Sequence, residues 1–204
     1  MAPAPTLVDG DEVTSIPIAS DAAIIAATRN WLERAVIGLN LCPFAKSVHV
    51  KDLVRYVVSP AQTTDALLDV LESELKFLVE VAAEEVDMTL IMTPAALTNF
   101  DDFTDFLDLV EVVLRSHGLV GILQVASFHP DYVFADAEAD DIANHTNRAP
   151  YPTLHLIREA SLARATAAFP DASEIYLRNI ETMRALGLEG WQALDVGASA
   201  KPKA

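Results

Sequence analysis

Hydrophobic residues recur at helical spacing in three stretches of the first 120 residues. The first occupies residues 20–39, where Ser20 is suited to cap the opening turn. The second begins near Thr64, and the third begins at Asn99 or Asp101. We therefore predict three amphipathic helices, joined by segments of a different pattern.

Short runs rich in β-branched residues alternate with these helices, and each run is stopped by a nearby proline. The alternation predicts a βαβαβ core with parallel strands. Ser59 and Thr93 end the first two runs, and His129 follows the third. We expect these three residues to meet at the carboxyl edge of the sheet, where open α/β folds usually bind ligands. The predicted strands are residues 53–59, 88–93 and 119–128.

The last third of the chain returns to helical spacing after an acidic loop that starts at residue 131. One helix is predicted from Pro152 or Thr153 to Ala167, and another runs from about residue 171 to Gly187. The fold class is therefore α/β: a small parallel or mixed sheet with an N-terminal helix and a C-terminal helical pair. We predict a single α/β domain over residues 18–196, flanked by disordered tails at residues 1–17 and 197–204.

Composition narrows the classes of partner. The net charge is −16, and residues 61–141 hold 18 acidic side chains against two basic ones. Such a surface disfavours nucleic acid and anionic membranes, and no apolar run is long enough to cross a bilayer. The single cysteine, Cys42, and an N-terminus unlike a secretion signal indicate a cytoplasmic protein. A small-molecule ligand is the partner that this composition leaves open.

A metal site is the first hypothesis for function. His129 and Asp131 lie two residues apart, and His155 and Glu159 would share one face of the predicted helix. With His145 as a further imidazole, this set suits a divalent metal such as zinc, manganese or iron. The structural alternative is that His129 holds a turn, while His155 and Glu159 form a surface pair.

Cysteine chemistry is the second hypothesis. Cys42 precedes a proline that can open a short helical turn, where the helix dipole would favour a thiolate. His129 or His155 would act as the base, with Asn144 or Asn147 orienting the imidazole. The alternative is a buried structural cysteine. The catalytic candidates of the first two hypotheses are His129, His155, Cys42 and Glu159.

Anion binding without catalysis is the third hypothesis. Arg148 and Arg158 can fork onto a carboxylate or phosphate, and Arg158 would lie in the first turns of a helix, whose backbone N–H groups favour anions. The alternative is that Arg158 pairs with Glu159 or with the acidic half of the chain. No glycine-rich phosphate loop is present. The ligand-binding candidates are Arg148, Arg158, Asn147, Asn144, Tyr151, Ser127 and Thr93.

Four sequence blocks carry a resemblance: LNLCPFAK, QVASFHPDY, NRAPYPTLHLIRE and GWQAL. Together they resemble the domain-of-unknown-function family 1415 of bacterial proteins, over roughly residues 20–194. The resemblance implies a compact intracellular bacterial protein and assigns no reaction.

The expected protein has a polar cleft at the carboxyl ends of its strands. It would be a metal- or cysteine-dependent enzyme acting on a small substrate, or else a non-catalytic module that binds a carboxylate or phosphate.

Overall fold

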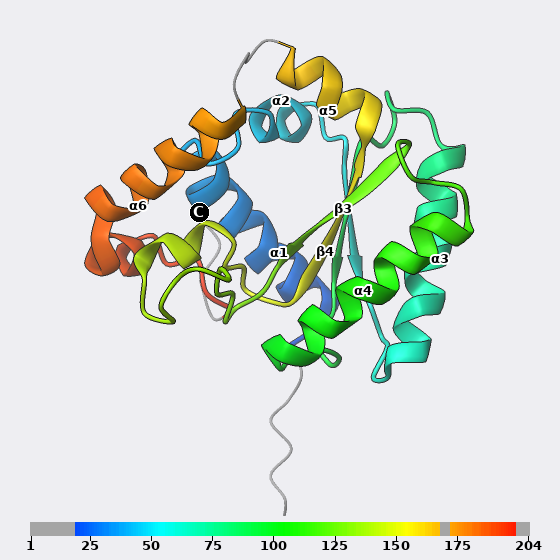
Figure 1. The fold of residues 1–204 in the computed structure, drawn as a ribbon, viewed down its shortest axis with the longest axis horizontal. Helices are drawn as coiled ribbons and strands as arrows, with labels where there is room; N and C mark the ends of the chain where they lie inside the picture. The colour runs from blue at the N-terminus through cyan, green and yellow to red at the C-terminus, as the bar shows by residue number, and fades with distance from the viewer. Residues whose placement is uncertain (1–18, 168–171, 199–204) are drawn as a thin grey trace, which may run out of the picture.

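The computed structural model describes residues 19–167 and 172–198, and the predicted tails lie outside this part except for residues 197–198. Helices and strands alternate through most of the chain (Figure 1). In order, the elements are α1 (Asp21–Trp31), the π-helix η1 (Leu32–Ile37), α2 (Ala45–Val50), β1 (Val54–Val58), α3 (Thr64–Glu80), β2 (Met88–Met92), α4 (Phe100–Ser116), β3 (Leu123–Phe128), the 3₁₀-helix η2 (Ile142–Thr146), β4 (Thr153–Arg158), α5 (Glu159–Thr166) and α6 (Ala172–Ala193).

The four strands form one mixed sheet in the order β1-β2-β4-β3. The β1 and β2 strands are parallel, and β4 is antiparallel to both of its neighbours, β2 and β3. The β3 strand therefore runs in the same direction as β1 and β2, as the βαβαβ pattern predicts. The last strand in the sequence separates β3 from the other two.

The predicted helix over residues 152–167 is wrong in its first half. Residues Thr153–Arg158 form β4, and helix α5 begins only at Glu159. Leu154 and Leu156 alternate with His155, which is the period of a strand. The flanking β2 and β3 strands supply backbone partners along the whole of β4, and these tertiary contacts override the helical pattern that follows.

Two other predicted boundaries also shift. The third strand begins at Leu123 rather than residue 119, because a turn occupies the preceding residues and Gly121 has a left-handed φ of 78°. The final helix passes beyond Gly187, where the backbone kinks at a φ of 66°. The C-terminal helical pair is α5 and α6.

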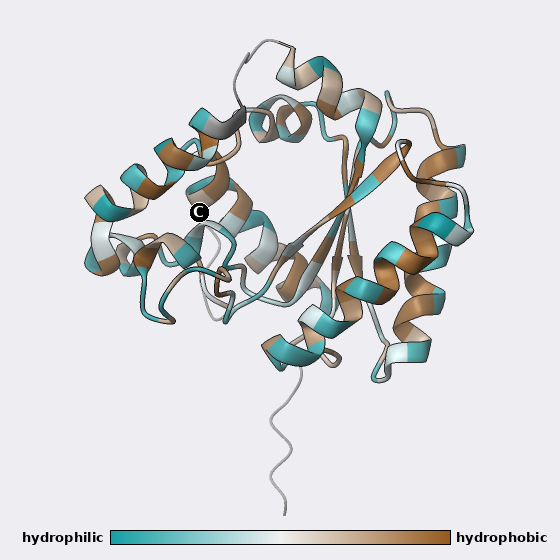
Figure 2. Cartoon of the chain, viewed as in Figure 1, coloured by the Kyte–Doolittle hydropathy of each residue, from teal (hydrophilic) through white to brown (hydrophobic). Residues whose placement is uncertain are grey.

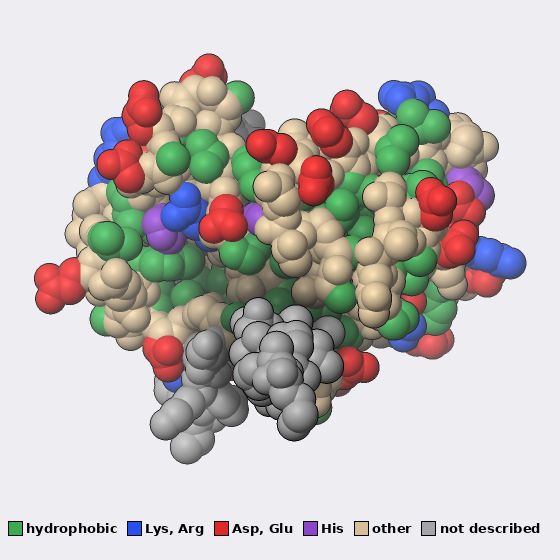
Figure 3. Space-filling model, turned by 90° about the horizontal axis from the view of Figure 1, so that it is seen from below, with side chains coloured by type: hydrophobic (Ala, Val, Ile, Leu, Met, Phe, Trp, Pro, Cys, Tyr) green, Lys and Arg blue, Asp and Glu red, His purple; other side chains and the backbone are tan. Residues whose placement is uncertain are grey.

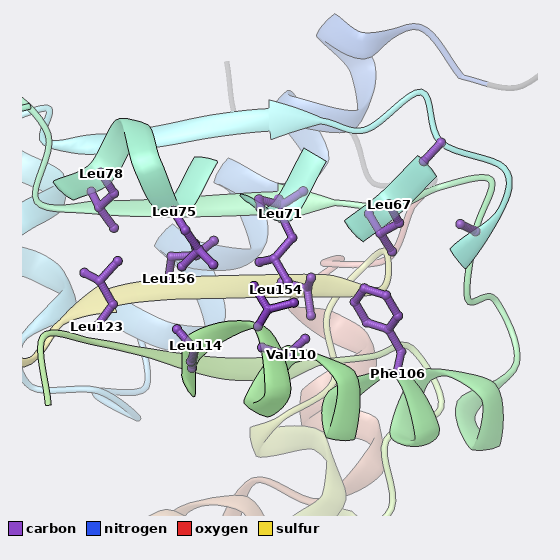
Figure 4. Packing of buried hydrophobic residues seen from close by; sticks show 14 of the residues in the cluster. Leu67, Leu71, Leu75, Leu78, Phe106, Val110, Leu114, Leu123, Leu154 and Leu156 are labelled. Carbon is purple, nitrogen blue, oxygen red and sulfur yellow. The ribbon is translucent and has the colours of Figure 1, made fainter. Parts of the chain in front are cut away.

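Helices α3 and α4 cover one face of the sheet (Figures 1 and 2). Thr63 and Asn99 cap their first turns through side-chain oxygens that accept backbone N–H groups. Leucines on the inner stripes of the helices meet Leu154 and Leu156 from β4 (Figure 4). The fully buried leucines of this cluster include Leu67, Leu71, Leu78, Leu154 and Leu156. This is the main hydrophobic core.

Helix α1, η1 and α2 lie on the opposite face, with α6 beyond them (Figure 1). The C-terminal segment is fixed to this layer, since Asn30 donates to the Asp195 carbonyl at 2.9 Å and Arg34 to the Leu194 carbonyl at 2.9 Å. Within the described residues, no helix is long and apolar enough to cross a membrane.

The main core generates a stability prediction. Leu71→Ala should lower the free energy of unfolding by roughly 2–5 kcal/mol, because Leu71 is 0% exposed and its removal leaves a cavity between α3 and the sheet. Urea denaturation measures the change. Leu109→Ala on α4 is the matched control, since Leu109 is 40% exposed and should cost about 0.5 kcal/mol or less. Equal losses in the two variants would contradict this description of the core.

Candidate functional site

The polar residues that follow β1, β2 and β3 meet at one edge of the sheet, as predicted, but they face inward. Ser59, Thr93 and His129 are each 1% exposed or less. The Ser59 hydroxyl accepts the Ala61 backbone N–H at 3.2 Å, and the Thr93 hydroxyl lies 3.1 Å from the Ala96 carbonyl that accepts its proton. These side chains close turns within the fold.

His129 uses both of its ring nitrogens in the same way. Its Nδ1 accepts the backbone N–H of Asp131 at 3.0 Å, so its Nε2 carries the proton and donates to the Leu97 carbonyl at 3.2 Å. The ring packs against Phe100 and Phe103 of α4, at 5.3 and 5.1 Å between centroids. Burial lowers the pKa of His129. The geometry matches the structural alternative, in which His129 holds a turn.

The two candidate asparagines organise the loop between β3 and β4. Asn144 is fully buried, accepts the Phe134 N–H at 3.1 Å and donates to the Glu138 carbonyl at 2.8 Å. Asn147 donates to the Ser127 carbonyl at 3.4 Å. Their amides therefore satisfy backbone groups of the loop and of β3, which fixes the path of a long connection.

Arg148 joins the same loop. It donates from Nε to the Tyr132 carbonyl at 3.1 Å and from Nη2 to the Ala139 carbonyl at 3.0 Å, with Nη1 3.4 Å from His145 Nε2. Burial, followed by the nearby Arg148 charge, lowers the pKa of His145. The guanidinium thus holds the acidic loop against η2.

Arg158 lies at the opposite end of the sheet from Arg148. It pairs with Leu123 at the start of β3 rather than opening a helix, and its Nη2 donates to the carbonyls of Val81 and Val86 at 2.7 and 3.1 Å. Tyr151 packs beside β1 and β2, where burial raises its pKa. The structure does not bring the predicted anion-binding residues together.

Of the four predicted metal ligands only His129 and Asp131 are neighbours, and His129 Nδ1 is already occupied by the Asp131 backbone N–H. His129 packs against α4 on one face of the sheet, whereas His155 lies in the middle of β4 and faces the other side. Glu159 is the first residue of α5, so the helix face that was to pair it with His155 does not exist. Among the described residues, no group of three or more His, Cys, Asp or Glu side chains is placed to hold a metal ion.

A pocket of about 460 Å³ lies over the face of the sheet that α3 and α4 leave uncovered. This volume falls in the range of roughly 300–1,000 Å³ typical of small-molecule sites. Its walls come from η1, α2 and α5, and most of its lining is apolar. The floor is formed by residues of the sheet: Met88, Leu90, Ala126, Phe128, His155 and Ile157.

His155 is the polar group on this floor. Its Nε2 lies 3.1 Å from the sulfur of Met88, a weak acceptor, and this contact favours the tautomer with the proton on Nε2. Its Nδ1 is then an acceptor, and no described residue donates to it. Burial lowers the pKa of His155 to about 4, so the ring is neutral at ordinary pH. The pocket therefore contains a neutral hydrogen-bond acceptor in apolar surroundings.

Cys42 lines the same pocket, but not as the helix cap that the sequence suggested. Helix α2 begins at Ala45 with Phe44 in the cap position, and Cys42 lies in the preceding turn. The thiol is partly buried and packs with the cluster around Trp31. Of the two candidate bases, His155 shares the pocket with Cys42, whereas His129 does not line it.

The π-helical turns of η1 form one wall. Leu32 and Val36 line the pocket from it. The Gly38 N–H bonds the Glu33 carbonyl five residues back, at 3.0 Å, and a Cβ at Gly38 would collide with the Arg34 carbonyl oxygen. Such widened turns are often found at functional sites. The predicted helix over residues 20–39 is therefore a regular helix followed by a π-helix that borders the pocket.

Fold and pocket together define an α/β protein with a mixed four-stranded sheet and an apolar cavity on one sheet face. A family model described as "Protein of unknown function (DUF1415)" matches residues 23–193, and the chain belongs to this family. The resemblance carried by the four sequence blocks is thereby confirmed. No curated protein and no solved structure matches the chain.

Sequence reasoning missed most of the pocket. Met88, Ala126 and Phe128 alternate with core residues along their strands, and the alternation around His155 would have placed it on the same face. No comparable sequence pattern predicts that α5 residues line the pocket, because the position of α5 depends on where β4 ends.

The buried imidazole gives a pH prediction. An unfolded histidine has a pKa of about 6.5, whereas that of folded His155 is about 4, so acid favours the unfolded chain as pH falls from about 6.5 to 4. His155→Gln should reduce the loss of stability between about pH 7 and pH 4.5 by roughly 2 kcal/mol. Urea denaturation at the two pH values tests this. His117→Gln, at the half-exposed end of α4, is the control for replacing a histidine outside the pocket.

Proposed function

We propose that the protein binds a small, largely apolar molecule in the pocket over β4 and β3. The observation that carries the proposal is the lining: apolar side chains from seven elements surround one imidazole, that of His155, which burial keeps neutral at ordinary pH. Sites of this kind take most of their affinity from apolar burial, and the few polar groups set orientation. This develops the non-catalytic alternative that the sequence left open.

Cysteine-dependent catalysis is the second candidate, because Cys42 and His155 line one pocket. The pKa of about 4 for His155 weighs against it. An imidazole this weakly basic does not hold a proton taken from a thiol, whose ordinary pKa is about 8.5. We therefore rank reversible binding first.

The proposal includes a cytoplasmic location and no nucleic-acid partner. Two observations support it: the single cysteine is a free thiol, and acidic side chains are spread over the face seen in Figure 3. A binder of small molecules needs no basic surface.

Dye binding tests the proposed function. Nile red, a neutral apolar dye, should bind to the purified protein with enhanced fluorescence, and Ala165→Phe should weaken binding about ten-fold or more, because Ala165 lines the pocket from α5 and a phenyl ring would fill it. Ala163→Phe is the matched control, since Ala163 lies on the exposed side of the same helix and should bind as wild type. Absence of dye binding to the wild-type protein, or equal binding by both variants, would reject the proposal.

Thiol protection gives an independent check. Saturating Nile red should slow alkylation of Cys42 by N-ethylmaleimide about ten-fold, because the dye and the thiol share the pocket. At the same dye concentration, protection should be smaller in Ala165→Phe, because this variant binds the dye more weakly. Cys42→Ser should still bind the dye, because the proposed binding needs no reaction at the thiol.

A further inference from the structure

Three ionic side chains line the otherwise apolar pocket: Lys51 after α2, Asp87 before β2 and Arg164 on α5. They give the lining a net charge of +1, in a chain whose net charge is −16. The pocket is thus positively charged in an acidic protein, because Lys51 and Arg164 outnumber Asp87.

The carboxylate of Asp87 is already engaged. The Ser161 hydroxyl donates its proton to Asp87 Oδ1, and the same hydroxyl oxygen accepts from Arg164 Nη2 at 2.8 Å. Asp87 and Arg164 thus bond to opposite sides of Ser161. This chain fixes one nitrogen of the guanidinium, and its remaining N–H groups have no partner among the described residues.

Lys51 has no ion-pair partner in the described part of the chain. Three other arginines use their donors within the fold. Arg55 forms a two-point contact with Glu74 at 2.8 and 3.0 Å, while Arg148 and Arg158 donate to backbone carbonyls. Lys51 and Arg164 are therefore solvent-exposed cations that line the apolar pocket and have donors left over.

We infer that the ligand of this pocket is an amphipathic carboxylate, with its apolar body over Ala126, Phe128 and His155 and its single negative charge held by Arg164 and Lys51. The inference rests on the proposed function and names its ligand class. One negative charge offsets the net charge of the lining, and the planar guanidinium suits a carboxylate.

Decanoate and decanol test this directly, since they share one alkyl chain and differ in the charge of the head. Each is titrated against protein loaded with Nile red, below the concentration at which it forms micelles. Wild-type protein should release the dye at about ten-fold lower decanoate than decanol. Arg164→Gln and Lys51→Gln should each weaken decanoate about three- to ten-fold and leave decanol unchanged.

Lys46→Gln controls for overall charge, because Lys46 is exposed on α2 and does not line the pocket. Equal affinity for decanoate and decanol in the wild type, or an unchanged decanoate affinity in both pocket variants, would overturn the carboxylate assignment while leaving the proposed function intact. Failure of Nile red, decanoate and decanol alike to bind would reject the proposed function itself. A dimer that excludes the dye would show that a second copy covers the pocket, and would overturn both.

Discussion

The antiparallel insertion of β4 between β2 and β3 is the constraint on which the rest of the structure depends. The β3 strand has no other strand partner among the described residues, and β2 would lose one of its two neighbours without β4. Side chains of β4 also serve both faces: Leu154 and Leu156 enter the main core, whereas His155 forms part of the pocket floor. Six residues therefore determine the sheet, its principal core and the orientation of the candidate site.

Local sequence patterns were sufficient to predict those helices and strands whose own residues determine their structure. The sequence pattern predicted where α3 and α4 begin to within one residue, and the proline-stopped runs predicted β1 and β2. The pattern failed over residues 153–158, where a strand signal of six residues continues directly into a helix. A short apolar run is compatible with either structure. Pairing with β2 and β3, which are not adjacent to it in the sequence, makes this run a strand.

The candidate site shows a related effect, since only Cys42 and His155 of the predicted catalytic residues line the pocket. Polar residues near strand ends looked like ligands or catalysts, but a long connection between β3 and β4 leaves many backbone groups to satisfy, and Asn144, Arg148 and His129 satisfy them. The pocket lies on a sheet face lined by residues such as Met88 and Phe128. Apolar residues of these types predict burial but do not indicate a binding site. A loop rich in polar side chains can therefore reflect the number of backbone groups that need hydrogen-bond partners, rather than a ligand-binding site.

The position of β4 also bears on how the chain is made. The β1 strand, α3 and β2 are contiguous in sequence and can pair as soon as they leave the ribosome, whereas β3 emerges with its edges open and waits until residue 158 has been synthesised. During that interval an uncharged six-residue strand is free to pair with another chain. Insertion of β4 gives β3 its strand partner and covers one of its two edges, while the other edge stays at the margin of the sheet. The hydrogen bonds of Asn144, Asn147 and Arg148 that order the connecting loop therefore also help to keep β3 paired.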